Sequence, residues 1–183
     1  AEAVQRISKE AEERRGYKID TDFEKMDDSV SRFMREEVFE QVAKRLADPV
    51  ALAELTAVLD GDKHIPISTQ TGTLDSGTRN NSGSGFTTLL NTLVNAFCKY
   101  SISRLSGASK QDAFDSIGLC HGDDGAIAPV TTRKQWTEAC KLFCEHTGMS
   151  IKTEVMDAKD PTVFLGRIYP APLTTPVSLM RSE

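Results

Sequence analysis

The spacing of apolar and polar residues predicts several helices along the chain. A polar helix is expected over 1–15, and Gly16 should end it, because glycine commonly follows the last turn of a helix. Residues 29–48 carry apolar side chains at intervals of three and four, and Asp28 or Ser29 can cap this helix. Its expected apolar positions are Val30, Phe33, Met34, Val38, Val42 and Leu46.

Four further helices are expected over 49–59, 86–105, 109–116 and 133–146. The helix over 86–105 is the longest of them, and its apolar side chains recur at helical spacing. The side of this helix that should face a core comprises Leu89, Leu90, Leu93, Val94 and Phe97.

Strands are predicted in the remaining segments. Single strands are expected over 17–22, 65–74 and 150–155, and strand–turn–strand units over 117–130 and 163–170. Strands mixed with helices in this order predict an antiparallel sheet covered by helices, which is an α+β domain.

The composition is that of one globular domain. The chain has 183 residues, of which 39% are hydrophobic and 27% are charged. No apolar run reaches the roughly 18–20 residues that a membrane-spanning helix needs. The first residues contain neither the apolar core of a signal peptide nor an initiator Met, so we expect the chain to be a segment of a longer protein.

Charge and cysteine content narrow the function classes. The formal net charge of −5 counts against a protein that binds nucleic acid by bulk electrostatics, because phosphate contacts normally come from lysine and arginine. The spacing of the cysteines does not indicate a disulfide scaffold, so we expect small buried side chains in a reducing environment. The four cysteines are Cys98, Cys120, Cys140 and Cys144.

Two acidic turns, each at the end of a predicted strand, are the first candidate for chemistry. One contains Asp22 and Asp27, and the other contains Asp123 and Asp124. Neighbouring ionised carboxylates repel one another, so such turns are unfavourable unless a cation is bound. Mg²⁺ prefers oxygen ligands, and two ions held jointly by Asp22 and Asp123 would suit in-line displacement at a phosphate. Taken singly, each turn is more simply explained as a solvated turn.

A glycine-rich loop that leads directly into a predicted helix is the second candidate. The loop contains Ser82 and Gly83, and the helix places Thr87 and Asn91 on one face. Glycine lets backbone N–H groups approach a sugar-phosphate chain closely, and a ribose hydroxyl can partner a buried polar side chain. A linker followed by an ordinary helix start explains these residues equally well.

In chain order, these features resemble motifs A, B and C of the palm of RNA-dependent RNA polymerases from positive-strand RNA viruses. Two downstream segments, SIKTE at 150–154 and FLGR at 164–167, resemble motifs D and E. Five motifs in this order are a specific signal, and the chain looks closest to nodavirus-like polymerases. The residues that match motifs A to C are Asp22-x4-Asp27, Ser82-Gly83-x3-Thr87-x3-Asn91 and Gly122-Asp123-Asp124.

The resemblance implies catalytic roles for four of these residues. Asp22 and Asp123 would be ligands of Mg²⁺, or of Mn²⁺, with Asp124 beside them as a supporting ligand. Lys152 would protonate the pyrophosphate leaving group, although Lys159 also fits the loose spacing of motif D.

The resemblance also implies a nucleotide site next to these carboxylates. Asp27 and Asn91 would sense the ribose hydroxyls of the incoming nucleotide, with Ser82 or Thr87 assisting. Gly83 would let the loop flex as the template and the nascent pair move, and the motif E turn would grip the nascent strand.

The implied domain is a ferredoxin-like palm over 17–170. Residues 1–16 would be the end of the fingers or a connecting helix, and residues 171–183 the start of the thumb or a tail. The implied reaction is template-directed nucleotidyl transfer from NTPs to the 3′-OH of RNA. The implied partners are template and nascent RNA, NTPs, and other replicase subunits or copies of the chain, at membrane-associated replication complexes in the host cytoplasm. Nothing in 1–16 resembles the basic motif F, so the segment by itself is expected to be inactive.

Two alternatives stay open from sequence. A reverse-transcriptase-like enzyme shares the two-aspartate chemistry, but it ordinarily has an aromatic-x-Asp-Asp where this chain has His121–Asp124, and a bulky residue in place of Asp27. An isolated palm could also be a non-catalytic module that binds RNA or a partner.

Overall fold

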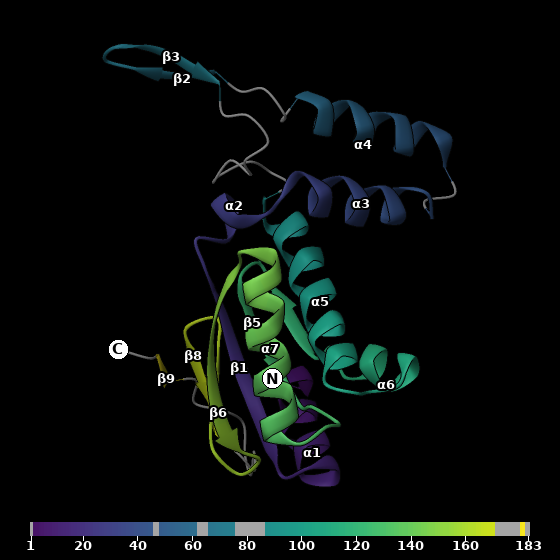
Figure 1. The fold of residues 1–183 in the computed structure, drawn as a ribbon, viewed down its shortest axis with the longest axis vertical. Coiled ribbons are helices and arrows are strands. Elements are labelled where there is room, and N and C mark those ends of the chain that lie inside the picture. The colour runs from purple at the N-terminus through teal and green to yellow at the C-terminus, as the bar shows by residue number, and fades with distance from the viewer. Residues whose placement is uncertain (1, 46–47, 62–65, 76–86, 171–179, 182–183) are drawn as a thin grey trace.

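A four-stranded antiparallel sheet with the strand order β4-β5-β1-β6 forms the centre of the protein (Figure 1). The computed structural model describes residues 2–45, 48–61, 66–75, 87–170 and 180–181. The strands of this sheet are β1 (Tyr17–Glu24), β4 (Leu119–His121), β5 (Asp124–Ile127) and β6 (Ser150–Asp157). The α+β fold with an antiparallel sheet, predicted from sequence, is confirmed.

Helices cover both faces of this sheet. Figure 1 shows α7 (Arg133–Thr147) in front of the sheet with α5 (Thr87–Leu105) beside it, and α1 (Glu2–Arg14) behind its lower part. The short helix α6 (Lys110–Asp115) follows α5. A second sheet has the order β7-β8-β9 and consists of β7 (Thr162–Phe164), β8 (Arg167–Tyr169) and β9 (Met180–Arg181).

The two faces of the sheet serve two separate cores, because successive residues of a strand point to opposite faces: Ile127 of β5 belongs to one core and its neighbour Ala126 to the other. Ile19 and Phe23 pack with α5 and α7, where Trp136 is fully buried. The opposite face is lined by small side chains, so that α1 lies close to the sheet. That second core comprises Ile7, Ala11, Ala126, Ala128 and Ala158.

Local capping explains why several helices start where the sequence predicts. Ser109 accepts a hydrogen bond from the Asp112 N–H at the start of α6, and Thr132 and Gln135 form a reciprocal capping box at the start of α7. Gly148 ends α7 with a φ of 72°, a left-handed conformation that glycine adopts without strain. These helix ends fix where the adjoining strands enter the sheet.

Between β1 and α5 the chain forms an arm that stands above the sheet in Figure 1. Residues 65–74 were predicted as one strand, but residues 66–75 form a hairpin within the arm. The arm consists of α2 (Met26–Ser29), α3 (Arg32–Ala43), α4 (Pro49–Gly61), β2 (Pro66–Thr69) and β3 (Gly72–Asp75).

The single helix predicted from residue 29 is wrong in its first turn. The helix breaks at Val30, whose ψ is 107°, and restarts with Ser31 accepting a hydrogen bond from the Met34 N–H at 3.2 Å. Val30 and Met34 are buried as predicted, whereas Phe33 is 66% exposed. Fewer of the predicted apolar positions are therefore buried than the periodicity indicated. Leu46 lies outside the described residues.

Candidate active site

The register of the central sheet brings the two acidic turns together. β1 and β5 pair antiparallel, and this pairing sets Asp22 directly opposite Asp124. Directly opposed residues of an antiparallel pair point to the same face of the sheet. Asp22 and the neighbouring Asp123 are exposed, and both line an open hollow of about 770 Å³. The proximity expected from the sequence is thus present.

The surroundings of Asp124 disfavour its charged form. Burial raises the pKa of Asp124, and the negative charges of Asp123 and Asp22 raise it further. The backbone N–H of Leu165 donates to the Asp124 carboxylate and partly offsets this rise. A carboxylate whose charge is disfavoured by neighbouring carboxylates is a setting that a bound cation would relieve.

The donor set fits a hard divalent cation that is completed by a substrate. Within the described ranges, no three carboxylate, imidazole or thiol side chains converge as a ready-made metal cage. Mg²⁺ does not need one, because it commonly binds through one or two carboxylates plus substrate phosphates and water. The residues that would hold such an ion are Asp22, Asp123 and Asp124.

Asp27 and Asn91 form a hydrogen-bonded pair next to Asp28, which lines the hollow. Asp27 lies in α2, immediately after β1, and the left-handed conformation of Lys25 turns the chain there. The Asn91 Nδ2 donates to the Asp27 Oδ1 at 2.7 Å. Thr87 stands at the first position of α5, one turn before Asn91. The remaining two residues implied in nucleotide binding, Ser82 and Gly83, lie outside the described residues.

The two candidate lysines lie at opposite ends of β6. Lys152 pairs with Asp22 across β1 and β6, and its Nζ lies 2.9 Å from the Glu24 Oε1. The hydrogen bond and the charge of Glu24 raise the pKa of Lys152, which keeps the ammonium group protonated. Lys159 follows Asp157, which pairs with the first residue of β1, far from the carboxylates. Of the two lysines, Lys152 is the one placed beside Asp22.

A group of side chains on α5 that the sequence analysis missed contacts the turn carrying Asp123. The Thr92 Oγ1 accepts a hydrogen bond from the Gly122 N–H at 2.8 Å. The Asn95 Nδ2 lies 3.0 to 3.2 Å from the carbonyl oxygens of residues 122, 123 and 124. Polar residues spaced three and four apart in an otherwise apolar helix are a signal that could have revealed this contact.

A buried lysine, Lys99, lies against the two strands that flank this turn. Lys99 is 1% exposed, and its Nζ donates to the Leu119 carbonyl oxygen at 2.6 Å. Burial lowers the pKa of Lys99, while the neighbouring Cys120, Asp20 and Asp124 act in the opposite direction.

The second glycine of the turn makes room for this lysine. A Cβ added at Gly125 would lie 1.9 Å from the Lys99 Nζ and 2.8 Å from the Thr21 Oγ1. The Gly-Asp-Asp-Gly sequence therefore reflects packing beneath the turn as well as the turn itself.

The β7–β8 hairpin is attached to the carboxylate face of the sheet. Its Val163 N–H donates to the Asp20 Oδ2 at 3.2 Å, and its Leu165 N–H donates to Asp124. Leu165 has a φ of 52°, so this turn is held in a conformation that non-glycine residues rarely adopt. The predicted hairpin is confirmed, and two acidic side chains fix its place.

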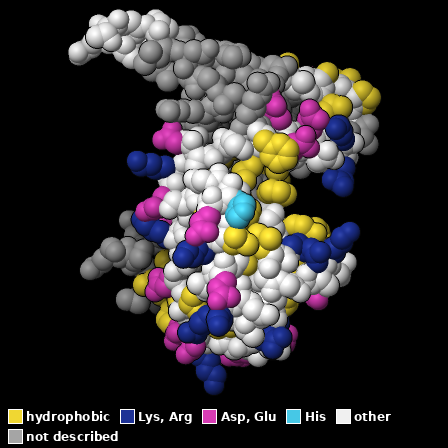
Figure 2. Space-filling model, in the orientation of Figure 1, with side chains coloured by type: hydrophobic (Ala, Val, Ile, Leu, Met, Phe, Trp, Pro, Cys, Tyr) yellow, Lys and Arg dark blue, Asp and Glu magenta, His cyan; other side chains and the backbone are white. Residues whose placement is uncertain are grey.

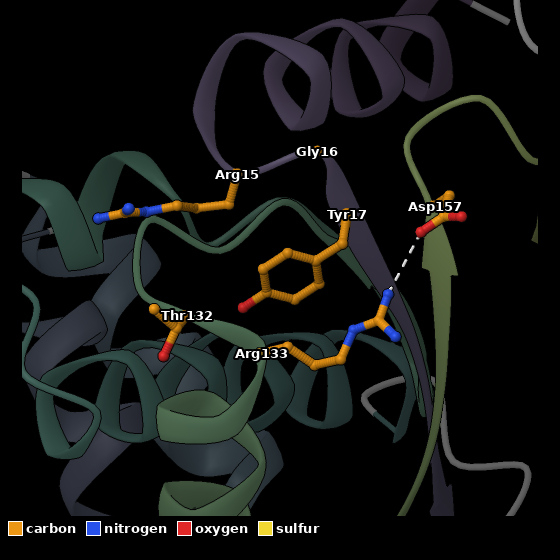
Figure 3. A pocket seen from close by; sticks show the side chains of 6 residues that line it. All are labelled: Arg15, Gly16, Tyr17, Thr132, Arg133 and Asp157. Atoms are coloured by element: carbon orange, nitrogen blue, oxygen red, sulfur yellow. Dashed lines mark hydrogen bonds and ion pairs between the residues drawn. The ribbon is translucent and has the colours of Figure 1, made fainter.

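A second hollow, of about 230 Å³, lies at the other end of β1 (Figure 3). Arg133 pairs with Asp157 at 3.3 Å, and its guanidinium carbon is 5.6 Å from the centre of the Tyr17 ring. The Arg15 Nε donates to a backbone carbonyl oxygen, and the Tyr17 hydroxyl does the same. The polar groups named here already bond one another or the backbone, which indicates a structural role.

The visible surface carries no single dominant patch of charge. Figure 2 shows acidic and basic side chains interspersed over the lower body, with hydrophobic side chains grouped where α3 meets α5. Phe33 of α3 is 66% exposed, and Leu89 and Phe97 of α5, predicted to face a core, are instead 46% and 38% exposed. Among the helices of the described part of the chain, none has the length and apolar character needed to cross a membrane.

The sheet, its clustered carboxylates and the adjoining helix define the class of protein as a polymerase palm. The family model for viral RNA-dependent RNA polymerase matches residues 1–174. The chain therefore belongs to the viral RNA-dependent RNA polymerase family.

Nodaviral proteins are among its relatives. It is 32% identical over 181 residues to the RNA-directed RNA polymerase of Atlantic halibut nervous necrosis virus, covering 98% of this chain and 18% of that protein. It is 31% identical over 161 residues to that of Nodamura virus, covering 86% of this chain and 15% of that protein. The chain thus spans less than a fifth of the length of these relatives.

Solved structures agree on the fold. The RNA-dependent RNA polymerase of a human picorbirnavirus superimposes with a TM-score of 0.70 at 21% sequence identity, over 93% of this chain and 32% of that one. An insertion-loop deletion mutant of the same polymerase gives a TM-score of 0.69. The likeness to nodaviral polymerases expected from sequence is confirmed, and the reverse-transcriptase-like alternative is not favoured.

Proposed function

We propose that this chain is the palm that catalyses template-directed nucleotidyl transfer in viral RNA synthesis. The 3′-oxygen of the growing RNA would form a bond to the α-phosphorus of an NTP, and the bond from that phosphorus to the bridging oxygen would break to release pyrophosphate. The observation that carries this proposal is the pairing of Asp22 with Asp124, which joins the two acidic turns at one edge of the hollow.

Each residue of the site has a task in this proposal. Asp22, Asp123 and Asp124 would hold Mg²⁺, or Mn²⁺, whose positive charge would stabilise the attacking and leaving oxygens. Asp27 and Asn91 would bind the ribose, because their hydrogen-bonded pair offers both donor and acceptor groups to hydroxyls. Ser82, Gly83 and Thr87 complete the proposed nucleotide site, as the family resemblance implies.

Lys152 would supply the proton to the departing pyrophosphate. Its position beside Asp22 and its contact with Glu24 support this assignment over Lys159. A protonated ammonium close to the developing negative charge both stabilises that charge and can donate a proton.

The experiment that tests the function is a primer-extension assay with the full viral protein, an RNA template–primer and labelled NTPs. Mg²⁺-dependent extension that stops with EDTA and returns with added Mg²⁺ is the expected result. RNA binding without any extension would instead support a non-catalytic module, and extension with dNTPs in preference to NTPs would contradict the assignment.

The proposed setting is the host cytoplasm, at membrane-associated replication complexes that contain RNA and other replicase subunits or copies of the chain. This part of the proposal comes from the family resemblance alone. Fractionation of infected cells tests it: the protein should sediment with membranes and with newly made viral RNA.

A further inference from the structure

One side of α5 holds the turn that carries Asp123 by its backbone. Thr92 accepts a hydrogen bond from the Gly122 N–H, and the Asn95 amide points its Nδ2 at the carbonyl oxygens of Gly122, Asp123 and Asp124. Both donors and acceptors of a tight turn are thus bonded to a single helix. A turn held in this way has little freedom to shift its side chains.

Asn95 occupies an unfavourable position for a residue that only fills space. The side chain is fully buried, and its Oδ1 has no hydrogen-bond partner in the part of the chain that the structure describes. A buried acceptor without a partner destabilises the fold, and an apolar side chain of similar size would avoid this. What the amide does for the turn therefore explains its presence better than core packing does.

The same helix also carries the contact to the ribose-facing pair. Asn91, one residue before Thr92, donates to Asp27 of α2 at 2.7 Å. Because an α-helix is stiff over about one turn, the segment 91–95 fixes the distance between the Asp27–Asn91 pair and the turn that carries Asp123. The same rigid helix therefore positions both the Asp27–Asn91 pair and the turn that carries Asp123.

We propose that Thr92 and Asn95 are positioning residues for nucleotidyl transfer. They act through the backbone of residues 122–124 and set Asp123 in register with Asp22 and with the Asp27–Asn91 pair. The inference rests on the proposed function, because register matters only if these groups take part in one reaction. Loss of the contacts should lower the rate of transfer and leave nucleotide affinity nearly unchanged.

Substitutions at Thr92 give the sharper test, because Val keeps the shape and Ser keeps the hydroxyl. In the full viral protein, Thr92→Val should lower kcat for primer extension about 10-fold or more, with the KM for NTP within about twofold. Thr92→Ser should restore most of kcat. Thr56→Val is the matched control. The hydroxyl of Thr92 donates to the Thr88 carbonyl oxygen, and the hydroxyl of Thr56 in α4 donates in the same way to the carbonyl oxygen of Leu52.

Asn95→Asp gives a second, independent variant. It is nearly isosteric, but it turns acceptor oxygens toward three carbonyl oxygens, so kcat should fall further than with Thr92→Val. Hydrogen exchange provides a readout separate from activity. The Gly122 amide should exchange faster in Thr92→Val than in the wild type, and it should be unchanged in Thr56→Val.

The outcomes separate the inference from the function on which it rests. If the wild type extends RNA, Asp123→Ala does not, and Thr92→Val keeps the wild-type kcat and exchange rate, the inference is overturned while the function stands. A loss of kcat that Thr92→Ser fails to restore and that follows a fall in Tm would mean a purely structural role, which also overturns it. A wild-type protein that makes no RNA overturns both.

Discussion

The Asn91 Nδ2 donates to the Asp27 Oδ1 at 2.7 Å and so joins two residues that are 64 positions apart in the chain. The carboxylate fixes the orientation of the amide, because only the nitrogen of the amide can donate to it. An oriented amide and carboxylate next to Asp28, which lines the hollow, can tell a hydroxyl from a hydrogen atom. A ribose 2′-OH both donates and accepts, and a deoxyribose can do neither at that position.

Asn91→Ala is therefore expected to relax the discrimination of NTPs against dNTPs, by about 10-fold, the effect of one lost hydrogen bond to a charged network. The ratio of incorporation in direct competition measures this effect. Thr88→Ala, at an exposed position of the same helix, is the control and should leave the ratio unchanged. Unaltered selectivity of the Asn91 variant would remove Asn91 from the ribose site.

Asp22→Ala and Asp123→Ala are expected to lower RNA synthesis by at least about 10³-fold, since either change removes a proposed ligand of the reacting centre. Both side chains are exposed and repel Asp124, so the fold should persist, with a Tm equal to or above that of the wild type. Primer extension and thermal unfolding measure the two effects. Glu138→Gln, on the exposed side of α7, is the control. RNA synthesis by the Asp123 variant at the wild-type rate would contradict the assignment.

Lys152→Met should lower kcat by about 10²- to 10⁴-fold, which is the usual contribution of a general acid. Lys159→Met, at the far end of β6, should have no such effect. The pH profile provides the distinguishing measurement, because the alkaline fall in kcat should disappear when the titrating ammonium is removed. The reverse result, with Lys159 as the sensitive residue, would refute the assignment made from the geometry of β6.

Asp20 should make stability depend on pH. Burial raises the pKa of Asp20 from its ordinary 3.8 to about 7, and the hydrogen bond from Val163 only partly opposes this. Between those two values the folded protein holds a proton that the unfolded chain has lost, so stability falls as pH rises through this window and levels off above it.

Asp20→Asn removes this proton equilibrium and provides the comparison. In metal-free buffer, the Tm of the wild type should drop by a few degrees more than that of the variant between about pH 5 and about pH 7.5. Glu138→Gln should behave as the wild type does. Parallel Tm curves for the wild type and Asp20→Asn would show that Asp20 ionises normally in the folded state.

Local signals in the sequence predicted most of the elements correctly. Ser109, Thr132 and Gly148 form the caps and stops that their residue types predict, and strand alternation located β1 and β6. The break at Val30 was missed, because apolar periodicity continues through it and only the capping hydroxyl of Ser31 interrupts the helix. The 65–74 hairpin was missed for a related reason: Thr-rich sequence favours a strand and does not reveal a turn within it.

For the site, the chemistry was easier to predict from sequence than the supports. Residue type and order made Asp22, Asp123 and Asn91 candidates, and the sheet register places Asp22 beside the turn that carries Asp123. Thr92 and Asn95 were not, since their role depends on which side of α5 faces the turn. That information belongs to tertiary packing, although buried polar residues in an apolar helix should prompt a search for a partner.

The chain leaves the central sheet after β1 and returns to it only at β4, with α3, α4 and the β2–β3 hairpin in between. Asp22 and Asp124 face each other through interstrand hydrogen bonds, so the length of this excursion does not determine their separation. A slip of one residue between β1 and β5 would turn one aspartate to the other face, whereas insertions or deletions over 44–75 would leave both in place. Sequence drift in this lineage should therefore accumulate as changes of length in the arm, while the pairing of two short strands stays fixed.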